Sequence, residues 1–392
     1  MDIKIGAASV VIKDYIYFSA CDFNGLMRTD IKTGKTEYIC KFVKEENIEY
    51  VHSRAYVYRN EIWFVPGYGE YIACVNIETF DILYFELPYK SLGIKYKENP
   101  ALNKNGRVRL KSLDSGKYGN DKIFVIVAGT DTIAVIDLIN KKIIPYYDVI
   151  DPQTELMGYG AVHHDVLWMV PYSGEDLIAL NLKNGTVTRV TKDPSLDDCK
   201  SLCCSEGKIW FVPRKTDYIV YYDMNENEYH KIYDEKGDLF NKDYWYKDII
   251  EYKNEIWILP GDGKGIVAIN PDVLMIEKKN YIFNFAHEIK IDTDAAKLYM
   301  VSKINSRISW IEDDEKPVSS VRIQISDKYF REILEKIYGE NALSEYYKLL
   351  PAKISEKRIG LENFLFLIDE ISYKEDERAS KHIGMVVWKN TV

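Results

Sequence analysis

The chain has 392 residues, of which 46% are hydrophobic and 29% are charged, and its formal net charge is −9. This composition is typical of a soluble globular protein, and the acidic balance argues against nucleic acid or an anionic membrane as main partner, because phosphate binding requires a basic face. No apolar run approaches the roughly 18 residues of a membrane helix. The first residues lack the small-residue cleavage site of a signal peptide. We therefore expect a cytoplasmic protein that does not act at a membrane.

A short apolar segment with a central aromatic residue recurs along the chain. The central residues are Tyr17, Trp63, Phe124, Trp168, Trp210, Trp257 and Tyr299. Successive members lie 42 to 47 residues apart, except for a longer interval between the second and the third, which contains a polar insertion at 89–107. Self-similarity at a period of this length is the signature of a repeat architecture.

Each repeat contains four short strands bounded by turn residues. In the first repeat the segments are 8–12, 14–20, 25–30 and 36–42, and the third ends in an aspartate. Four such strands in about 45 residues are typical of one blade of a β-propeller. The sequence therefore predicts an all-β fold, a seven-bladed β-propeller of four-stranded antiparallel blades over 1–325.

The aromatic segment ends in proline in four repeats, at Pro66, Pro171, Pro213 and Pro260. Because proline cannot donate a hydrogen bond to a β-ladder, these residues mark the end of the second strand of a blade. The aromatic side chain at the centre of the segment is large enough to fill the gap between neighbouring blades. We therefore interpret the repeated aromatic residues as structural.

The repeat resembles that of bacterial propellers typified by virginiamycin B lyase, and more generally NHL-like propellers. These carry an aromatic-Phe strand followed by I-x-x-I/V-D/N and T-G. The Gly-His and Trp-Asp pairs of WD repeats and the Gly-Gly doublets of kelch repeats are absent. In the lyases the aromatic strand tends to end in Thr-Glu rather than in proline. The resemblance thus implies the architecture, while this departure speaks against lyase chemistry.

The start of the first strand in each blade is the place where we expect a binding site. In propellers this strand runs beside the central channel, and polar residues about ten positions before the central aromatic would line its funnel. In the first blade only Gly6, Ala7 and Ala8 occupy this place. The candidates in the other blades are His52, Ser53, Arg54, Lys111, Tyr159, Lys200, Tyr246, Lys247, Asp248, His287, Glu288 and Lys290, with Arg214 and Lys215 from a neighbouring loop.

These polar residues admit two interpretations. One is a water-filled channel without a ligand, since propeller channels are generally polar. The other is a cationic and aromatic pocket for a small anionic or polar ligand, in which Arg, Lys and His converge with Tyr and Trp. The G-Y-G at 67–69 is interpreted as a linker between two strands of the second blade and not as a ligand loop.

Metal and cofactor sites are not expected. The six cysteines lie in a chain that does not resemble a secreted protein, so we expect buried free thiols. The spacing of the last three, in 199–204, has no matching Cys or His pair nearby, which argues against zinc. The cysteines are Cys21, Cys40, Cys74, Cys199, Cys203 and Cys204.

After residue 325 the pattern changes from strand to helix. Ser326 is a helix cap, Gly339 is a stop, and the apolar residues between them recur on one helical face: Phe330, Ile333, Leu334 and Ile337. Further helices are predicted around 343–350, 361–371 and 374–388. This helical appendage, 326–392, could act as a lid, pair with a second copy of the chain to form a homodimer, dock on a partner, or pack on the propeller and stabilise it.

The leading hypothesis is a non-enzymatic binding or scaffold propeller that recognises a protein partner or a small polar or anionic ligand at the funnel face. The alternative is a lyase or hydrolase, with His52 or His287 as general base and Arg54 or Lys200 stabilising an anion. No catalytic triad or nucleophile elbow is visible, although propeller enzymes assemble sites from scattered blades. The identity of the ligand or partner does not follow from the sequence.

Overall fold

A computed structural model shows the arrangement of the chain. It describes residues 2–6, 8–45, 50–86, 103–104, 107–108, 110–112, 121–127, 133–146, 148–150, 159–171, 174–197, 199, 201–212, 218–233, 246–260, 264–282, 288–292, 297–302, 306–311 and 319–349. The predicted helices at 361–371 and 374–388 lie outside these residues.

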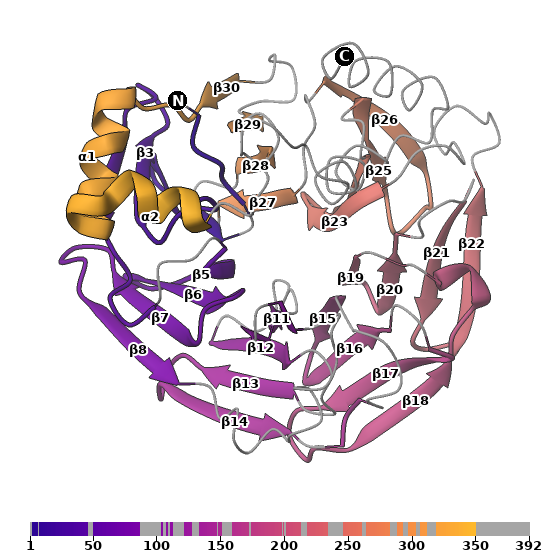
Figure 1. Ribbon diagram of the computed structural model, residues 1–392. Helices are drawn as coiled ribbons and strands as arrows, with labels where there is room; N and C mark the ends of the chain where they lie inside the picture. The colour runs from indigo at the N-terminus through magenta and orange to yellow at the C-terminus, as the bar shows by residue number, and fades with distance from the viewer. Residues whose placement is uncertain are drawn as a thin grey trace, which may run out of the picture.

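Seven four-stranded antiparallel sheets follow one another around a ring, which confirms the predicted seven-bladed propeller (Figure 1). The inner strands are β1 (Ser9–Ile12), β5 (His52–Tyr58), β11 (Leu110–Ser112), β15 (Tyr159–His163), β19 (Leu202–Ser205), β23 (Tyr246–Tyr252) and β27 (Glu288–Asp292). The second strands are β2 (Tyr15–Ser19), β6 (Glu61–Pro66), β12 (Lys122–Val127), β16 (Val166–Val170), β20 (Lys208–Phe211), β24 (Glu255–Pro260) and β28 (Lys297–Ser302).

The outer half of each blade is a hairpin. The third strands are β3 (Leu26–Asp30), β7 (Tyr71–Asn76), β13 (Ile133–Asp137), β17 (Asp176–Asn181), β21 (Tyr218–Asp223), β25 (Lys264–Ile269) and β29 (Arg307–Ile311). The outermost strands are β4 (Thr36–Cys40), β8 (Ile82–Glu86), β14 (Lys142–Tyr146), β18 (Val187–Thr191), β22 (Glu228–Tyr233), β26 (Ile276–Ile282) and β30 (Ser319–Arg322). Between blades 2 and 3, β9 (Asn103–Lys104) pairs with β10 (Arg107–Val108), and η2 (Pro194–Leu196) joins blades 4 and 5.

The repeated Asp or Asn at the end of the third strand forms the turn of this hairpin. The Asp30 carboxylate accepts hydrogen bonds from the backbone N–H groups of Lys32 and Thr33, at 2.8 and 2.9 Å. Asn76 does the same for the second and third residues after it. In such an Asx turn the side-chain oxygen accepts hydrogen bonds from backbone N–H groups that the reversing chain would otherwise leave without an acceptor. This explains why Asp or Asn recurs at this position.

Hydrophobic side chains fill every seam between neighbouring blades. Trp63 lies in the seam between blades 2 and 3, whereas the adjacent Phe64 lies in the seam between blades 1 and 2, because successive residues of a strand point to opposite faces. Trp210 and Trp257 are at most 1% exposed in the seams between blades 5 and 6 and between blades 6 and 7. The predicted structural role of the aromatic repeat is therefore confirmed.

The ring closes between blades 7 and 1. The inner strand β1 contacts both β5 and β27. The chain start lies beside the end of blade 7, since Asp2 forms an antiparallel bridge with Gln324, and the Ile3 N–H donates to the Ile323 carbonyl at 3.3 Å. Each blade thus consists of four consecutive strands, and a short pairing of the two ends joins the first blade to the last.

Two helices follow β30 and cover this closing seam. The helix α1 (Asp327–Tyr338) begins at the Ser326 cap, whose hydroxyl accepts from the Tyr329 N–H at 3.1 Å, and ends before Gly339, where φ is +76°. After η3 (Gly339–Asn341) comes α2 (Ala342–Leu349). Cap, stop and both helices agree with the prediction. No helix of the part described here is long and apolar enough to cross a membrane.

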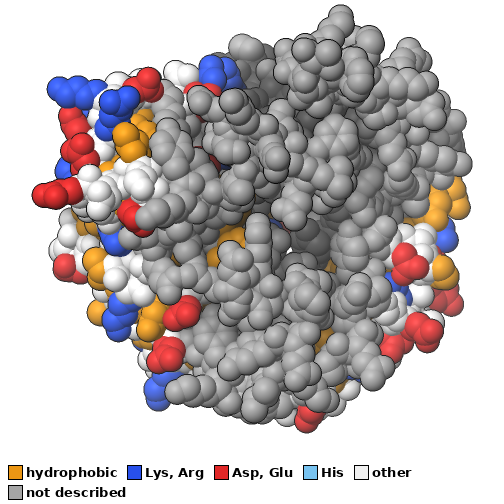
Figure 2. All heavy atoms as spheres, in the orientation of Figure 1, with side chains coloured by type: hydrophobic (Ala, Val, Ile, Leu, Met, Phe, Trp, Pro, Cys, Tyr) orange, Lys and Arg blue, Asp and Glu red, His pale blue; other side chains and the backbone are white. Residues whose placement is uncertain are grey.

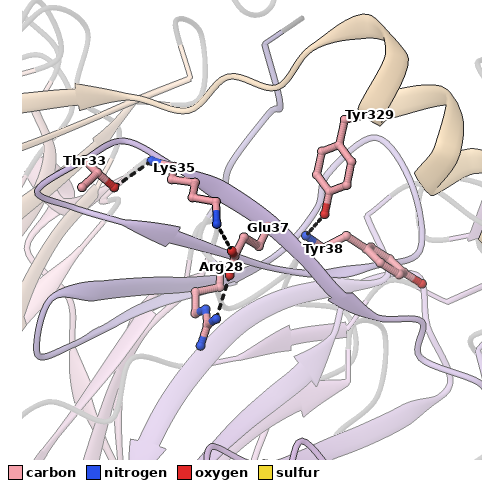
Figure 3. Close-up of polar contacts among 6 residues, drawn as sticks. All are labelled: Arg28, Thr33, Lys35, Glu37, Tyr38 and Tyr329. Atoms are coloured by element: carbon pink, nitrogen blue, oxygen red, sulfur yellow. Dashed lines mark hydrogen bonds and ion pairs between the residues drawn. The ribbon is translucent and has the colours of Figure 1, made fainter.

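The apolar face of α1 belongs to the same hydrophobic cluster as blades 7 and 1. Phe330 contacts Phe23 edge to face, at 6.0 Å between ring centres. The Tyr38 N–H of β4 donates to the Tyr329 hydroxyl at 3.0 Å, and Glu37 of the same strand pairs with both Arg28 and Lys35 (Figure 3). The Phe330–Phe23 contact and the hydrogen bond between Tyr38 and Tyr329 hold α1 on the propeller, so for this first part of the appendage the structure shows packing against blades 1 and 7.

Candidate functional site

The β-register identifies one equivalent position near the start of each inner strand. It is the residue of the first strand that pairs with a particular residue of the second strand, namely the one two positions after the central aromatic. In blade 2, for example, Arg54 lies opposite Val65, and in blade 4 Tyr159 lies opposite Val170. We call this set the ring positions; its members are Ala8, Arg54, Lys111, Tyr159, Ser201, Asp248 and Glu288.

Five predicted funnel residues therefore occupy equivalent positions in five different blades. All ring positions lie close to one face of the propeller, which we call the entry face, because each inner strand begins there. In an antiparallel blade the outermost strand ends on that same face, so α1 also begins there. On the side of the molecule seen in Figure 2, the charged side chains of described residues lie toward the rim.

The side chains at two ring positions contact each other across neighbouring blades. The Ser201 hydroxyl donates to the Asp248 carboxylate at 2.9 Å, which links blades 5 and 6. The same carboxylate oxygen accepts from the Ile249 N–H at 3.0 Å. Asp248 is half-buried, as is Arg54. One side-chain contact thus joins the ring positions of blades 5 and 6.

Blades 2 and 6 carry a β-bulge at this place. The register shifts between His52 and Arg54 in β5, and between Tyr246 and Asp248 in β23, opposite Pro66 and Pro260 respectively. The extra residue is Ser53 in the first case and Lys247 in the second. A bulge changes the direction in which the neighbouring side chains project, and no local sequence pattern predicted it.

His52 lies in the core between blades 1 and 2, and not at the channel as expected. It is 3% exposed, packs against the rings of Phe42 and Phe64, and its Nδ1 lies 2.9 Å from the Ser19 hydroxyl. No other described residue forms a hydrogen bond with its Nε2. Burial lowers the pKa of His52 to about 3, because the imidazolium form would lose its hydration. These properties are those of a neutral core histidine.

Tyr246 is likewise buried, at 1% exposed, in the seam between blades 5 and 6. Lys290 lies two residues after the ring position of β27, opposite the central Tyr299. Three further candidates, Lys200, Arg214 and His287, lie outside the described residues, as does Lys215. In blade 5 the ring position is held by Ser201 and not by Lys200, because the antiparallel register places Ser201 opposite Val212.

The two residues that follow the G-Y-G of blade 2 bind an internal carboxylate. Glu45, which is 4% exposed, accepts hydrogen bonds from the N–H groups of Glu70 and Tyr71, at 2.8 to 3.1 Å. A Cβ added at Gly69 would lie 2.7 Å from a carboxylate oxygen, so only glycine allows this approach. The segment joins β6 to β7, as predicted, and it also anchors the connection between blades 1 and 2. No sequence signal pointed to Glu45.

One group of described side chains has the composition of a metal site. The ligand atoms of Glu226, Glu228 and His230 lie within 4.8 Å of one another on the outer hairpin of blade 5, and the His230 ring stacks on Tyr221. Both glutamates are exposed, and the group lies far along the blade from the ring positions. All six cysteines are free thiols, four of them buried, as predicted.

Comparison with solved structures supports the architecture. A streptogramin B lyase superposes with a TM-score of 0.57 at 15% identity, covering 77% of this chain and 92% of the lyase. A catalytically inactive virginiamycin B lyase from Staphylococcus aureus with quinupristin gives a TM-score of 0.52 at 14% identity, covering 82% and 95%. At these identities the likeness shows the fold alone. No protein-family model and no curated protein matches the chain.

Proposed function

We propose that the chain is a non-enzymatic binding propeller that holds a small polar or anionic ligand at its entry face. The observation that carries this proposal is the ring of equivalent positions. In every blade but the first, this position holds a polar or charged residue, although the strands around it are strongly apolar. Apolar residues would suffice for folding there, so polar residues at the same position of several blades favour recognition of a ligand.

The enzymatic alternative has less support. Its general base was His52 or His287, and His52 is enclosed between two phenylalanine rings, where no substrate proton is within reach. Arg54, the proposed anion-stabilising group, serves a binding site equally well. The neighbouring structures are lyases by their printed names, but their likeness to this chain is one of fold.

Binding without chemical conversion is tested with the purified full chain and a panel of small polar compounds: carboxylates, phosphate esters, amino acids and neutral sugars. A ligand should raise the Tm in a concentration-dependent way, because it binds only the folded state. The Arg54→Gln variant should weaken that shift, whereas Lys142→Gln, an exposed change on β14, should not.

The same samples, followed by proton NMR over several hours, distinguish binding from catalysis. Under the proposal the spectrum of the bound compound stays unchanged. Consumption of the compound by wild-type protein would instead establish an enzyme, and a panel without any Tm shift would contradict a small-molecule site at this face.

A further inference from the structure

The outer hairpin of blade 5, formed by β21 and β22, brings together two carboxylates and an imidazole. They belong to Glu226, Glu228 and His230, and their ligand atoms lie within 4.8 Å of one another. Glu228 and His230 are two positions apart on β22, so their side chains project from the same face of the strand. Glu226 belongs to the turn that leads into this strand. The group thus combines one nitrogen and two oxygen ligands on a single hairpin.

The imidazole of His230 is held in place by a row of stacked rings. It stacks on Tyr221 of β21, with 4.9 Å between ring centres and 15° between the planes, and the Tyr221 ring centre lies 4.9 Å from that of Trp210 on β20. Trp210 and Tyr221 are buried in the seam between blades 5 and 6. The histidine is therefore the outermost ring of a row that is anchored in the core, and its orientation does not depend on a bound ion.

The turn of this hairpin differs from the equivalent turns of other blades. The third residue after the Asp or Asn that begins the turn is Thr33 in blade 1, Thr79 in blade 2 and Asn184 in blade 4. In each case its side chain accepts a hydrogen bond from the N–H group two residues further on, which stabilises the turn. In blade 5 the same position is Glu226, whose carboxylate lies 3.0 Å from Nε2 of His230. This carboxylate thus faces an imidazole of β22.

Charge and hydrogen bonding make the group suitable for a cation. In the part of the chain that the structure describes, no lysine or arginine forms an ion pair with Glu226 or Glu228. The two carboxylates repel each other at this separation, and a cation between them would remove the repulsion. Nε2 of His230 is shielded from solvent and forms no hydrogen bond with a described residue. In a neutral imidazole such a nitrogen keeps a lone pair for a metal ion.

We propose that Glu226, Glu228 and His230 bind a divalent transition-metal ion of the Zn²⁺ type. Ligand atoms on one tetrahedral Zn²⁺ lie about 3.3 Å apart, so the two exposed glutamate side chains need to move by about 1 to 2 Å. The nitrogen ligand favours Zn²⁺ over Mg²⁺ and Ca²⁺, which prefer oxygen ligands. Three protein ligands leave a coordination position to water. The inference does not depend on the proposed function, because this hairpin lies away from the ring positions.

Metal binding is measured by titration calorimetry on the full, untagged chain after treatment with a chelator. Zn²⁺ and Co²⁺ should each bind to one site per chain, whereas Mg²⁺ at the same concentrations should not bind. The absorption spectrum of the Co²⁺ form should lack a thiolate-to-cobalt charge-transfer band, because no cysteine is a ligand. Zn²⁺ should also raise the Tm of the chain, because it binds the folded state.

Three variants and two matched controls assign the ligands. His230→Gln removes the nitrogen ligand and should weaken Zn²⁺ binding about ten- to a hundredfold, with loss of the Tm shift. Glu226→Gln and Glu228→Gln each remove an anionic ligand and should weaken binding as well. His164→Gln and Glu78→Gln should leave binding unchanged, because each alters an exposed side chain of the same type on another blade. The Tm without metal reports whether each variant folds.

The outcomes decide the assignment. If Zn²⁺ does not bind, or if the three variants bind it as tightly as wild type, the group is an ion pair of a histidine with glutamate and the inference is wrong. If His164→Gln removes binding and His230→Gln retains it, the ion binds at the adjacent rings of His163 and His164 instead. A cobalt–thiolate band would place the ion at a cysteine, which also contradicts the inference. None of these results bears on ligand binding at the entry face.

Discussion

At the scale of single residues, His52 shows how burial decides the role of a titratable group. The side chain looks from the sequence like a ligand or a base, yet in the folded chain it is a neutral ring between two phenylalanines with one hydrogen bond to Ser19. Its pKa of about 3 in the folded state, against 6.5 for an exposed histidine, has a consequence for stability.

Between pH 6.5 and about 3 the unfolded chain binds a proton at His52 that the folded chain does not. Stability therefore falls as the pH decreases through this window, with a contribution of up to about 1.4 kcal/mol per pH unit. Urea unfolding at several pH values should show a steeper dependence for wild type than for His52→Gln. The exposed His164→Gln is the control, and equal slopes for wild type and His52→Gln would contradict the assignment.

Glu45 carries a second prediction at this scale. Replacing it with alanine leaves the N–H groups of Glu70 and Tyr71 without their acceptor and should lower the free energy of unfolding by about 2 to 4 kcal/mol. Glu45→Gln retains one acceptor oxygen and should cost less. Denaturant titration measures both, with the exposed Glu70→Ala as reference; equal stability of Glu45→Ala and Glu70→Ala would show that the buried carboxylate does not hold the loop.

At the scale of elements, α1 behaves as a part of the propeller and not as an attached lid. Its four apolar residues are buried with side chains of blades 1 and 7, and its Tyr329 hydroxyl accepts a hydrogen bond from β4. The outward face of the helix is charged and exposed. The helix thus covers the seam in which the two ends of the chain meet.

Truncation of the α1 core should therefore destabilise the whole molecule. Leu334→Ala creates a cavity in the seam between blades 7 and 1 and should cost about 2 to 5 kcal/mol in the free energy of unfolding. Arg331→Ala, on the exposed face of the same helix, should cost less than about 0.5 kcal/mol. If both variants are as stable as wild type, α1 does not contribute to the closure of the ring.

At the scale of the whole molecule, a ring of blades gains its stability from the seams between them. Because α1 shares the closing seam, the helix and the propeller should unfold together. We expect a single transition in denaturant, with the same midpoint whether it is followed by tryptophan fluorescence or by circular dichroism at helical wavelengths. An earlier loss of the helical signal would show that the appendage is a separate unit.

The sequence by itself determined the architecture and the role of the repeated residues. The prediction rested on the period of the repeat, on the aromatic residue at the centre of the second strand and on the Asp or Asn of the hairpin turn. Each strand and each turn is formed by consecutive residues, so these features are visible in the sequence itself. The cap and the stop of α1 are local for the same reason. The region in which ring positions would lie also followed from counting along the strands.

The tertiary structure alone decided which of these residues stand at equivalent positions. A bulge in β5 and in β23 moves the register by one residue, and a shift of one residue transfers a side chain from one face of a strand to the other. This is why His52 and Tyr246 are in the core while Arg54 and Asp248 are ring positions. In blade 5, where the pairing of β19 with β20 has no such shift, the pairing of Leu202 with Phe211 places Ser201 rather than Lys200 at the ring position. The contact of Glu45 with a loop of the next blade, and that of α1 with the first blade, join segments far apart in the chain, and no local pattern encodes such pairings.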